Sequence, residues 1–253
     1  MTQPDPTHDA LGRPDPAKVT LFGTRLSPFV EKVARALELK DVAFTLAEPR
    51  SPTDFQKWNP QAGKMPVLDV GGERVYDSTL ILRRLDELAP EPPLVDAVAE
   101  VAGRQRFLED WSDESLYWYV MALRWAAPNA KASAAQVAAS LPLPAFAMPV
   151  MRMIIRRQIG RQATAQGLVR LPLDVILDEL GRRFDELLAW LGDSPFLFSS
   201  RPSVADLAIF GQLKALRSGP TPQGEELITM RPTLVAYAQR VDEATRAKLG
   251  SGS

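Results

Sequence analysis

The chain has 253 residues, of which 45% are hydrophobic and 24% are charged, and its formal net charge is -1. This is ordinary globular composition, with enough length for two domains. The balance of charges gives no support to a nucleic-acid partner, which needs clustered excess Lys and Arg. Cysteine is absent and His8 is the one histidine. A disulfide, a thiolate or multi-histidine metal site, a cysteine nucleophile and a histidine-based triad are therefore excluded, and we expect no metal.

We expect both ends of the chain to lie outside the folded domains. Residues 1–16 are rich in Pro and acidic residues and lack the basic and apolar regions of a secretory signal, which predicts a disordered leader. Residues 248–253 are typical of a flexible tail. No stretch reaches about 18 uninterrupted apolar residues, so we expect no membrane span and a cytoplasmic location.

The first part of the chain predicts the element order β-α-β-α-β-β-α. The apolar run Val19–Phe22 indicates a buried strand, and residues 28–39 indicate a helix with Pro28 at its first position. Further strands are expected at 42–46, 66–70 and 74–76, the last two joined by a turn at Gly71-Gly72, with helices at 53–58 and 77–88.

After a break at Pro90–Pro93, no convincing strand is present. Helices are predicted at 98–125, 173–191, 203–216 and 233–247. The expected organisation is an α/β domain at 17–91 and an all-α domain at 97–247, with an insert near 126–171 that ends in a connection at 164–172.

The insert contains the segment MRMIIRRQIGRQ, whose apolar side chains fall within an arc of about 140° on a helical wheel. These are Met151, Ile154, Ile155 and Ile159, and four arginines, Arg152, Arg156, Arg157 and Arg161, fall mostly on the other side. One interpretation is a helix packed on the second domain with a solvated basic face. The other is a surface that contacts an anionic membrane or partner.

Four blocks of sequence resemble the glutathione transferase superfamily, in its serine-type, bacterial-like members. SPFVEKVARAL, NPQAGKMPVL and VYDSTLILRRLDE resemble the N-terminal domain, and RPSVADLAIFGQL resembles the folding motif of the helical domain. The resemblance covers residues 17–92 strongly and 97–246 more weakly. It implies a thioredoxin-like domain that binds glutathione as co-substrate, a helical domain that binds a small hydrophobic electrophile, a role in detoxification and a homodimer, which the insert could obstruct.

The resemblance implies that Pro66 follows Met65 through a cis peptide bond. It also implies that the main chain of Val67 pairs with the cysteinyl backbone of glutathione, as an added strand would. The alternative is an ordinary proline at the start of a strand. By the same resemblance Lys64 pairs with the glycyl carboxylate, although a loop lysine is usually only solvated.

Asp77 and Ser78 stand at the start of a predicted helix, where free N–H groups and the positive end of the dipole attract anions. The resemblance implies that Ser78 binds the γ-glutamyl carboxylate and Asp77 the α-ammonium. Plain capping by Asp77 is the alternative, and both functions can coexist.

Ser27 is the expected catalytic residue. It lies directly before Pro28, between the first strand and the first helix. The resemblance implies that its hydroxyl activates the glutathione thiol, whose ordinary pKa is about 8.5 or higher. A hydroxyl donor and a helix N-terminus both favour the thiolate. The alternative is that Ser27 only caps the helix. The absence of cysteine at this position argues against thiol–disulfide exchange.

An aromatic stripe is predicted along the helix at 98–125, because Phe107, Trp111, Trp118 and Trp125 fall within about 40° on a helical wheel. Such a stripe is more often core than ligand wall. By the resemblance this helix borders the cleft, so the expected electrophile-site residues are Phe29, Trp111, Glu114, Tyr117, Trp118 and Met121. The capping box at Ser203–Asp206 is interpreted as structural.

Two other functions remain open. The insert and the block WSDESLYWYVMALRW also resemble metaxin-like homologues, which act as binding or adaptor proteins. Ser27, Asp77 and Ser78 favour a competent thiol site instead, because an adaptor has no need of them. A glutathione-dependent isomerase or lyase would use the same residues.

Overall fold

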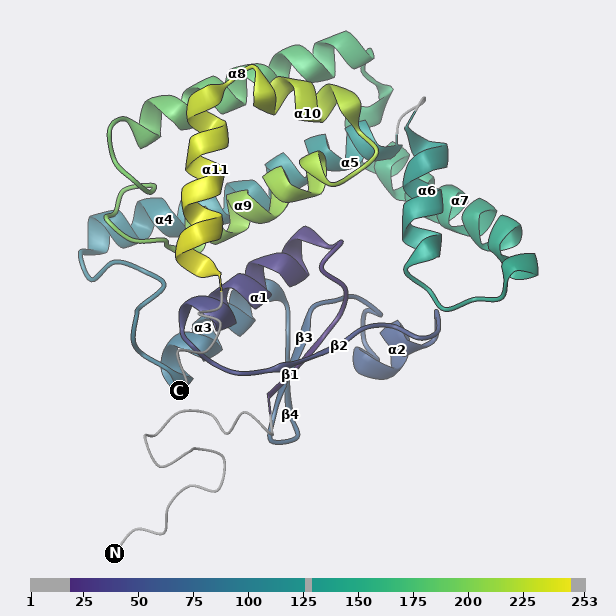
Figure 1. Ribbon diagram of the computed structural model, residues 1–253, viewed down its shortest axis with the longest axis horizontal. Helices are drawn as coiled ribbons and strands as arrows, with labels where there is room; N and C mark the ends of the chain where they lie inside the picture. The colour runs from purple at the N-terminus through teal and green to yellow at the C-terminus, as the bar shows by residue number, and fades with distance from the viewer. Residues whose placement is uncertain (1–18, 126–128, 247–253) are drawn as a thin grey trace, which may run out of the picture.

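The computed structural model describes residues 19–125 and 129–246. A small sheet carries two helices on one face, and the helices of the second domain lie beyond them (Figure 1). This is a thioredoxin-like domain with a mixed sheet, followed by an all-helical domain, as predicted. The predicted leader at 1–16 and tail at 248–253 lie outside the described residues, and the exact domain limits stay predictions.

The sheet has the strand order β2-β1-β3-β4. Strand β1 (Val19–Phe22) pairs in parallel with β2 (Thr45–Ala47) and antiparallel with β3 (Val67–Val70), and β3 pairs antiparallel with β4 (Glu73–Tyr76). The second strand begins three residues later than predicted. Val42 is buried in the core of this domain, but pairing with β1 starts only at Thr45.

Helix α1 (Pro28–Leu39) is deeply buried in the molecule. Every residue from Val30 to Leu37 is buried, because α1 lies between α3 (Ser78–Leu88) and the helical domain. The short helix α2 (Asp54–Trp58) lies beside β1, where the rings of Phe22 and Trp58 are 5.2 Å apart. The predicted order of elements in this domain is confirmed.

The helical domain begins with a helix that contains one wider turn. Helix α4 (Ala99–Trp111) continues through a π-helical turn (Ser112–Leu116) into α5 (Tyr117–Trp125). A single helix was predicted here. A π turn holds an extra residue, which shifts the faces of α5 relative to those of α4, and such turns are frequent at functional sites.

Six further helices follow, together with 3-10 turns at Ala145–Ala147 and Leu168–Arg170. They are α6 (Ala130–Ala139), α7 (Met148–Gln166), α8 (Leu173–Leu191), α9 (Val204–Arg217), α10 (Pro222–Thr229) and α11 (Pro232–Thr245). Helices α6 and α10 were not predicted. The alanine-rich sequence of α6 has no clear apolar period, and α10 has only two turns.

The two domains meet where α9 crosses α1. A Cβ atom on Gly211 of α9 would lie 2.5 Å from the carbonyl oxygen of Pro28, so only glycine permits this approach. Val204 and Leu207 of α9 complete the core of the first domain. The predicted capping box is present, and buried Asp206 also accepts a hydrogen bond from the Tyr237 hydroxyl at 2.8 Å. Its structural role is confirmed.

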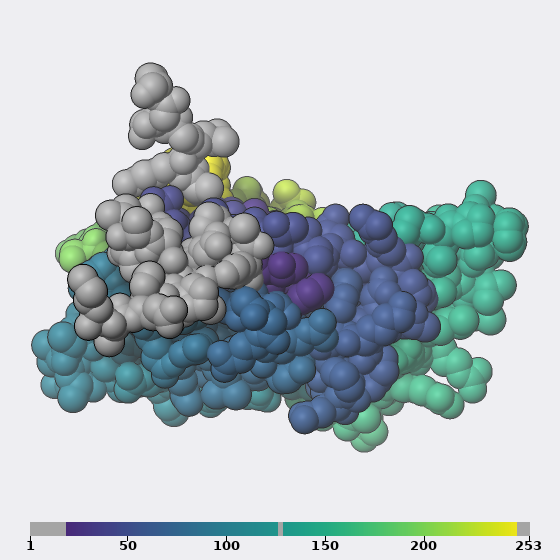
Figure 2. Space-filling view, turned by 90° about the horizontal axis from the view of Figure 1, so that it is seen from below, coloured from purple at the N-terminus to yellow at the C-terminus, as the bar shows by residue number. Residues whose placement is uncertain are grey.

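The insert forms a hairpin of α6 and α7 at one end of the molecule, coloured teal and green (Figures 1 and 2). Of the apolar residues predicted to face inward, Ile155 is buried and Met151 and Ile159 are half-buried, but Ile154 is exposed. The placement of Ile154 was therefore wrong, because the buried face of α7 is narrower than the predicted arc. The four arginines of the predicted basic face are exposed, as expected.

Within the described part of the chain, no helix is both long enough and apolar enough to cross a membrane.

Candidate functional site

Ser27 lies at the turn between β1 and α1. Its backbone is extended, and its carbonyl accepts the first helical hydrogen bond, from the Glu31 amide at 3.0 Å. Its side chain does not cap the helix, although it occupies the capping position. Ser27 is half-buried and directly precedes the first turn of α1, whose free N–H groups favour an anion. Its predicted role as a donor to a thiolate stays a prediction.

The start of α3 is capped by Asp77. One carboxylate oxygen of Asp77 accepts hydrogen bonds from the amides of Thr79 and Leu80, at 3.0 and 3.3 Å. The capping role considered in the sequence analysis is therefore present. Asp77 has a φ of 74°, a left-handed backbone conformation that costs free energy in a non-glycine residue. The side chain is exposed, so a ligand has access to the second carboxylate oxygen.

A buried lysine joins the starts of α1 and α3 to the π turn. The Lys32 ammonium contacts Glu109 at 2.6 Å and Asp113 at 2.7 Å, and it lies 3.4 Å from the hydroxyls of Ser78 and Thr79. Its side chain is 0% exposed. Asp113 belongs to the π turn, so this widened turn supplies one of the carboxylates of the cluster.

The carboxylates of this cluster outnumber its one cation. Burial raises the pKa of Asp113 to about 6, although Lys32 acts in the opposite direction, and the charges of Glu109 and Asp77 add to the rise. Burial alone would lower the pKa of Lys32, but Asp113 and Glu109 more than offset that effect, so its pKa is raised. The second oxygen of Asp113 is buried and has no hydrogen-bond partner among the described residues. The cluster can therefore accept a further cation or hydrogen-bond donor.

The turn before β3 contains the predicted cis peptide bond between Met65 and Pro66, which is confirmed. Val67 is the first residue of β3 and pairs with Phe22 of β1 on one side and with Tyr76 of β4 on the other. The sheet therefore covers both edges of Val67. A ligand in extended conformation can pair only with residues that precede β3. This favours the main chain of Met65 over that of Val67.

Lys64 lies in the preceding loop with an exposed side chain. Asn59 holds this loop, because its side chain donates to the Lys64 carbonyl at 3.2 Å and accepts from the Ala62 amide at 3.0 Å. The backbone at Lys64 is therefore fixed, while its ammonium is open to solvent. Its predicted contact with a ligand carboxylate stays a prediction.

Comparison with known proteins identifies the family. The model for the glutathione S-transferase N-terminal domain matches residues 21–93, and the model for the glutathione S-transferase C-terminal domain matches residues 181–241. The chain belongs to the glutathione S-transferase family.

Individual relatives agree with this assignment. A probable glutathione S-transferase from Solanum tuberosum is 36% identical over 83 residues, which cover 31% of this chain and 38% of that protein. The Beta-etherase LigF from Sphingobium sp. strain SYK-6 has a similar structure, with a TM-score of 0.66, 22% identity, and 89% and 95% of the two chains covered. Rice GST1, solved in complex with glutathione, has a TM-score of 0.59, 21% identity, and 90% and 89% covered. At these identities the structures show a shared fold.

The predicted electrophile-site residues of this glutathione S-transferase family member do not form one wall. The ring of Phe29, two residues after Ser27, lies 4.9 Å from that of Tyr117, which lies 5.1 Å from that of Trp118. Met121 is buried below them against α6 and α7. These four side chains continue from the start of α1 toward the insert. Burial raises the pKa of Tyr117, Arg124 opposes this, and the charge of Glu114 adds to it, so the hydroxyl stays protonated as a donor.

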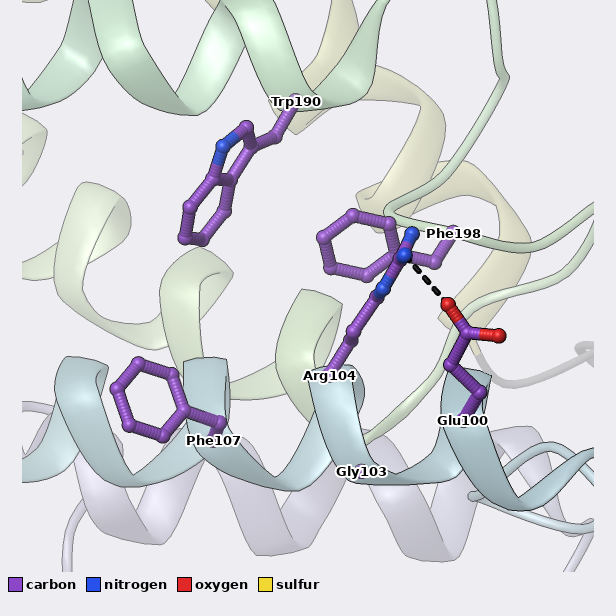
Figure 3. Close-up of a pocket in the computed structure, with 6 residues that line it drawn as sticks. All are labelled: Glu100, Gly103, Arg104, Phe107, Trp190 and Phe198. Carbon is purple, nitrogen blue, oxygen red and sulfur yellow. Dashed lines mark hydrogen bonds and ion pairs between the residues drawn. The ribbon is translucent and has the colours of Figure 1, made fainter.

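Trp111 and Glu114 are placed differently. Trp111 packs against the core of the helical domain, and Glu114 is exposed. Phe107 is 68% exposed and lines a separate cavity of about 620 Å³ with Trp190 and Phe198 (Figure 3). The predicted alignment of Phe107 and Trp111 with Trp118 and Trp125 was wrong, because the π turn shifts the faces of α5 relative to those of α4.

Lys32, Glu109 and Asp113 were not predicted as site residues. The sequence contained one usable signal for Lys32. It stands three residues after Phe29 and four before Ala36, on the apolar side of a predicted helix, where an unpaired lysine would be costly. A lysine there requires a carboxylate partner, but the partners lie more than 70 residues away in sequence.

Proposed function

We propose that this protein is a glutathione transferase that activates the thiol of glutathione for attack on a small hydrophobic electrophile. The observation that carries the proposal is the charge cluster beside Ser78. The start of α3 offers Ser78, whose hydroxyl lies 3.4 Å from the buried Lys32 ammonium, and Asp77 and Asp113 offer carboxylate oxygens with remaining acceptor capacity. This combination is complementary to an amino acid zwitterion, as found at the γ-glutamyl end of glutathione. Rice GST1, of the same fold, was solved with glutathione.

In the proposed complex, the α-carboxylate of glutathione accepts hydrogen bonds from Ser78, and the α-ammonium lies between Asp77 and Asp113. The cysteinyl backbone pairs with the main chain before β3, at Met65 and Pro66, and Lys64 attracts the glycyl carboxylate. The sulfur then lies at the start of α1. The Ser27 hydroxyl donates to it and lowers the thiol pKa, so that the thiol proton leaves to solvent.

The thiolate then forms a bond to an electrophilic carbon, and the leaving group departs with the bonding electron pair. The hydrophobic side of the electrophile is held by Phe29, Tyr117 and Trp118, which extend from the start of α1, and buried Met121 supports these rings from below. The Tyr117 hydroxyl is the second candidate donor to the sulfur. It becomes the main one if Ser27 proves to be dispensable.

Thermal unfolding in the presence of glutathione tests the binding step. A ligand that binds only the native state stabilises it by about 2.7 kcal/mol at one hundred times its Kd, so the melting temperature should rise. Asp77→Ala should abolish that rise. Asp96→Ala is the matched control, because Asp96 also caps a backbone amide, that of Val98, but lies at the start of α4. No rise at millimolar glutathione in the wild type contradicts the proposal.

A panel of electrophiles, including an ether because one structural relative is a Beta-etherase, tests the chemical step. Conjugates that contain the sulfur of glutathione support a transferase. Products formed without net consumption of glutathione indicate the isomerase or lyase alternative. Binding without turnover of any electrophile indicates the metaxin-like adaptor alternative.

A further inference from the structure

The insert differs in charge from the rest of the chain. Between Ser115 and Leu173 there is no Asp or Glu, whereas this segment contains seven of the 30 Lys and Arg residues. All 31 acidic residues therefore lie elsewhere. The near-zero net charge of the whole protein hides a basic region, and five of its seven basic residues lie on the α6–α7 hairpin, with Arg124 on α5 and Arg170 in the turn after α7.

The outward side of α7 is also apolar. Four large hydrophobic side chains are exposed there: Phe146 by 85%, Met153 by 63%, Val150 by 55% and Ile154 by 47%. At about 100° per residue, Val150, Met153 and Ile154 share an arc of about 100° with Arg157 and Arg161. We call these five residues, together with Phe146 in the turn before α7, the α7 outer face. It lies opposite Ile155 and Ile159, which pack toward the hairpin and α5.

The arginines of α7 have no partners in the part of the chain that the structure describes. Among the described residues, Arg152, Arg156, Arg157 and Arg161 form no ion pair and no side-chain hydrogen bond. Arg156, Arg157 and Arg161 instead line an open groove of about 740 Å³ with Trp125 and Arg170. A solvated basic face alone does not account for four exposed hydrophobic side chains beside them.

We propose that the α7 outer face binds the surface of a membrane that contains anionic phospholipids. A helix with apolar side chains along one line and arginines beside them lies in the interface of such a membrane, with its axis parallel to the surface. Phe146, Val150, Met153 and Ile154 enter the acyl boundary. The arginines bind lipid phosphates, and the arginine-lined groove receives a headgroup.

The shape of the hairpin favours a bilayer over a folded protein partner. The hairpin stands at one end of the molecule in both views (Figures 1 and 2). Its most exposed hydrophobic side chain, Phe146, lies in the turn that leads into α7. A protruding row of side chains can bind a folded protein only where that protein has a matching groove. A bilayer needs no such matching shape. With about 1.5 Å per residue, the 19 residues of α7 provide a contact about 28 Å long.

Co-sedimentation of the full chain with lipid vesicles tests the proposal. The protein should sediment with vesicles of phosphatidylcholine that contain phosphatidylglycerol, and at least tenfold less with phosphatidylcholine alone. Binding should weaken at 0.5 M salt, because the charge interactions are screened. Failure to sediment with the anionic vesicles, or equal binding to both kinds, would overturn the proposal.

Paired variants identify the contact. Arg157→Gln with Arg161→Gln should weaken partitioning roughly 30-fold, because each basic residue near an anionic surface contributes about a factor of five. Val150→Ser with Met153→Ser should weaken it at least tenfold. Arg83→Gln with Arg106→Gln and Val98→Ser with Phe107→Ser are the matched controls, since they change exposed side chains of the same kinds elsewhere. The controls should bind as the wild type does.

Further measurements separate loss of the membrane contact from loss of folding. Circular dichroism and the glutathione-induced rise in melting temperature should be unchanged in all four double variants, so that weaker sedimentation reports the surface itself. Equal weakening in the control pairs would overturn the assignment to α7. Binding to soluble polyglutamate without binding to vesicles would also overturn it, and would indicate an acidic protein partner instead.

Discussion

The start of α1 and the α6–α7 hairpin use basic side chains in opposite ways. Lys32 is completely buried between two carboxylates and two hydroxyls. Arg157 and Arg161 are exposed and have no acidic neighbour on their own helix. A buried charge is bound to specific partners, and its removal leaves them uncompensated. An exposed charge contributes little to folding and is available to a ligand. The start of α1 is therefore suited to a binding site with fixed partners, and the hairpin is suited to a contact surface with exposed charges.

The largest effect is expected for Lys32→Met. This variant leaves Glu109 and Asp113 buried without their cation, which costs about 3–5 kcal/mol in buried pairs. Chemical denaturation measures the change in the free energy of unfolding. Lys131→Met, on the exposed side of α6, is the control and should change it by less than about 0.5 kcal/mol. Equal effects of the two variants would show that the charge cluster is not formed in solution.

A smaller loss is expected for Gly211→Ala, at the contact of α9 with α1. The added methyl group would overlap the Pro28 carbonyl, and overpacking of this kind costs about 1–3 kcal/mol. Because Pro28 follows Ser27, affinity for glutathione should fall as well. Gly160→Ala, at an open position on α7, should be neutral or slightly stabilising. Gly211→Ala with unchanged stability would contradict the close approach.

The pH dependence of glutathione binding tests Asp113. Its raised pKa of about 6 means that it becomes negatively charged only as the pH rises through 6. An ammonium ligand should therefore bind up to about tenfold more tightly at pH 7 than at pH 5. Titration calorimetry should show this rise in the wild type and its absence in Asp113→Asn. Persistence of the rise in that variant would assign it to another group.

The same pKa shift has the opposite effect on folding. The folded state holds the Asp113 proton more tightly than the unfolded chain, whose carboxyl has a pKa of about 3.9. The contribution of Asp113 to stability is therefore present at low pH and decreases as the pH rises from about 4 to 6. As the pH rises through this range, the affinity for glutathione should increase while the contribution of Asp113 to the free energy of unfolding decreases.

The smallest effect on folding is expected for Arg157→Gln on the hairpin. An exposed side chain without partners should change the free energy of unfolding by no more than about 0.5 kcal/mol. Together with Lys32→Met, this variant separates a charge that the fold needs from one that it does not. A loss of several kcal/mol would show that Arg157 has a partner within the protein.

The sequence predicted those parts of the fold that have strong local signals. Helices α1 and α8 were predicted with the bounds that the structure shows, because each has a regular apolar face and a proline at or just before its start. Helix α6 was missed because alanines give no contrast between its faces. The π turn at Ser112–Leu116 was missed because it depends on packing with α9 and on the charge cluster, which are not local.

The candidate site could be predicted only in part. Ser27, Asp77 and Ser78 were predicted because motifs place them at helix starts, where backbone N–H groups lack helical partners. The structure has them at the starts of α1 and α3, and their roles toward glutathione stay predictions. The partners of Lys32 lie on a helix of the other domain, so no spacing in the sequence indicates them. Val67 pairs with strands on both of its sides, which is a property of the whole sheet that the sequence did not indicate.

The central claim is that the Ser27 hydroxyl stabilises the thiolate of bound glutathione. Thiolate absorbance of the complex, measured against pH for the wild type and Ser27→Ala, tests it most directly. Loss of one charge-assisted hydrogen bond should cost about 1.5–3 kcal/mol. That loss raises the thiol pKa by roughly one to two units. Thr24→Val, which removes another hydroxyl from the same turn, should leave the curve unchanged. Superimposable curves for the wild type and Ser27→Ala would contradict the claim and leave Tyr117 as the candidate donor.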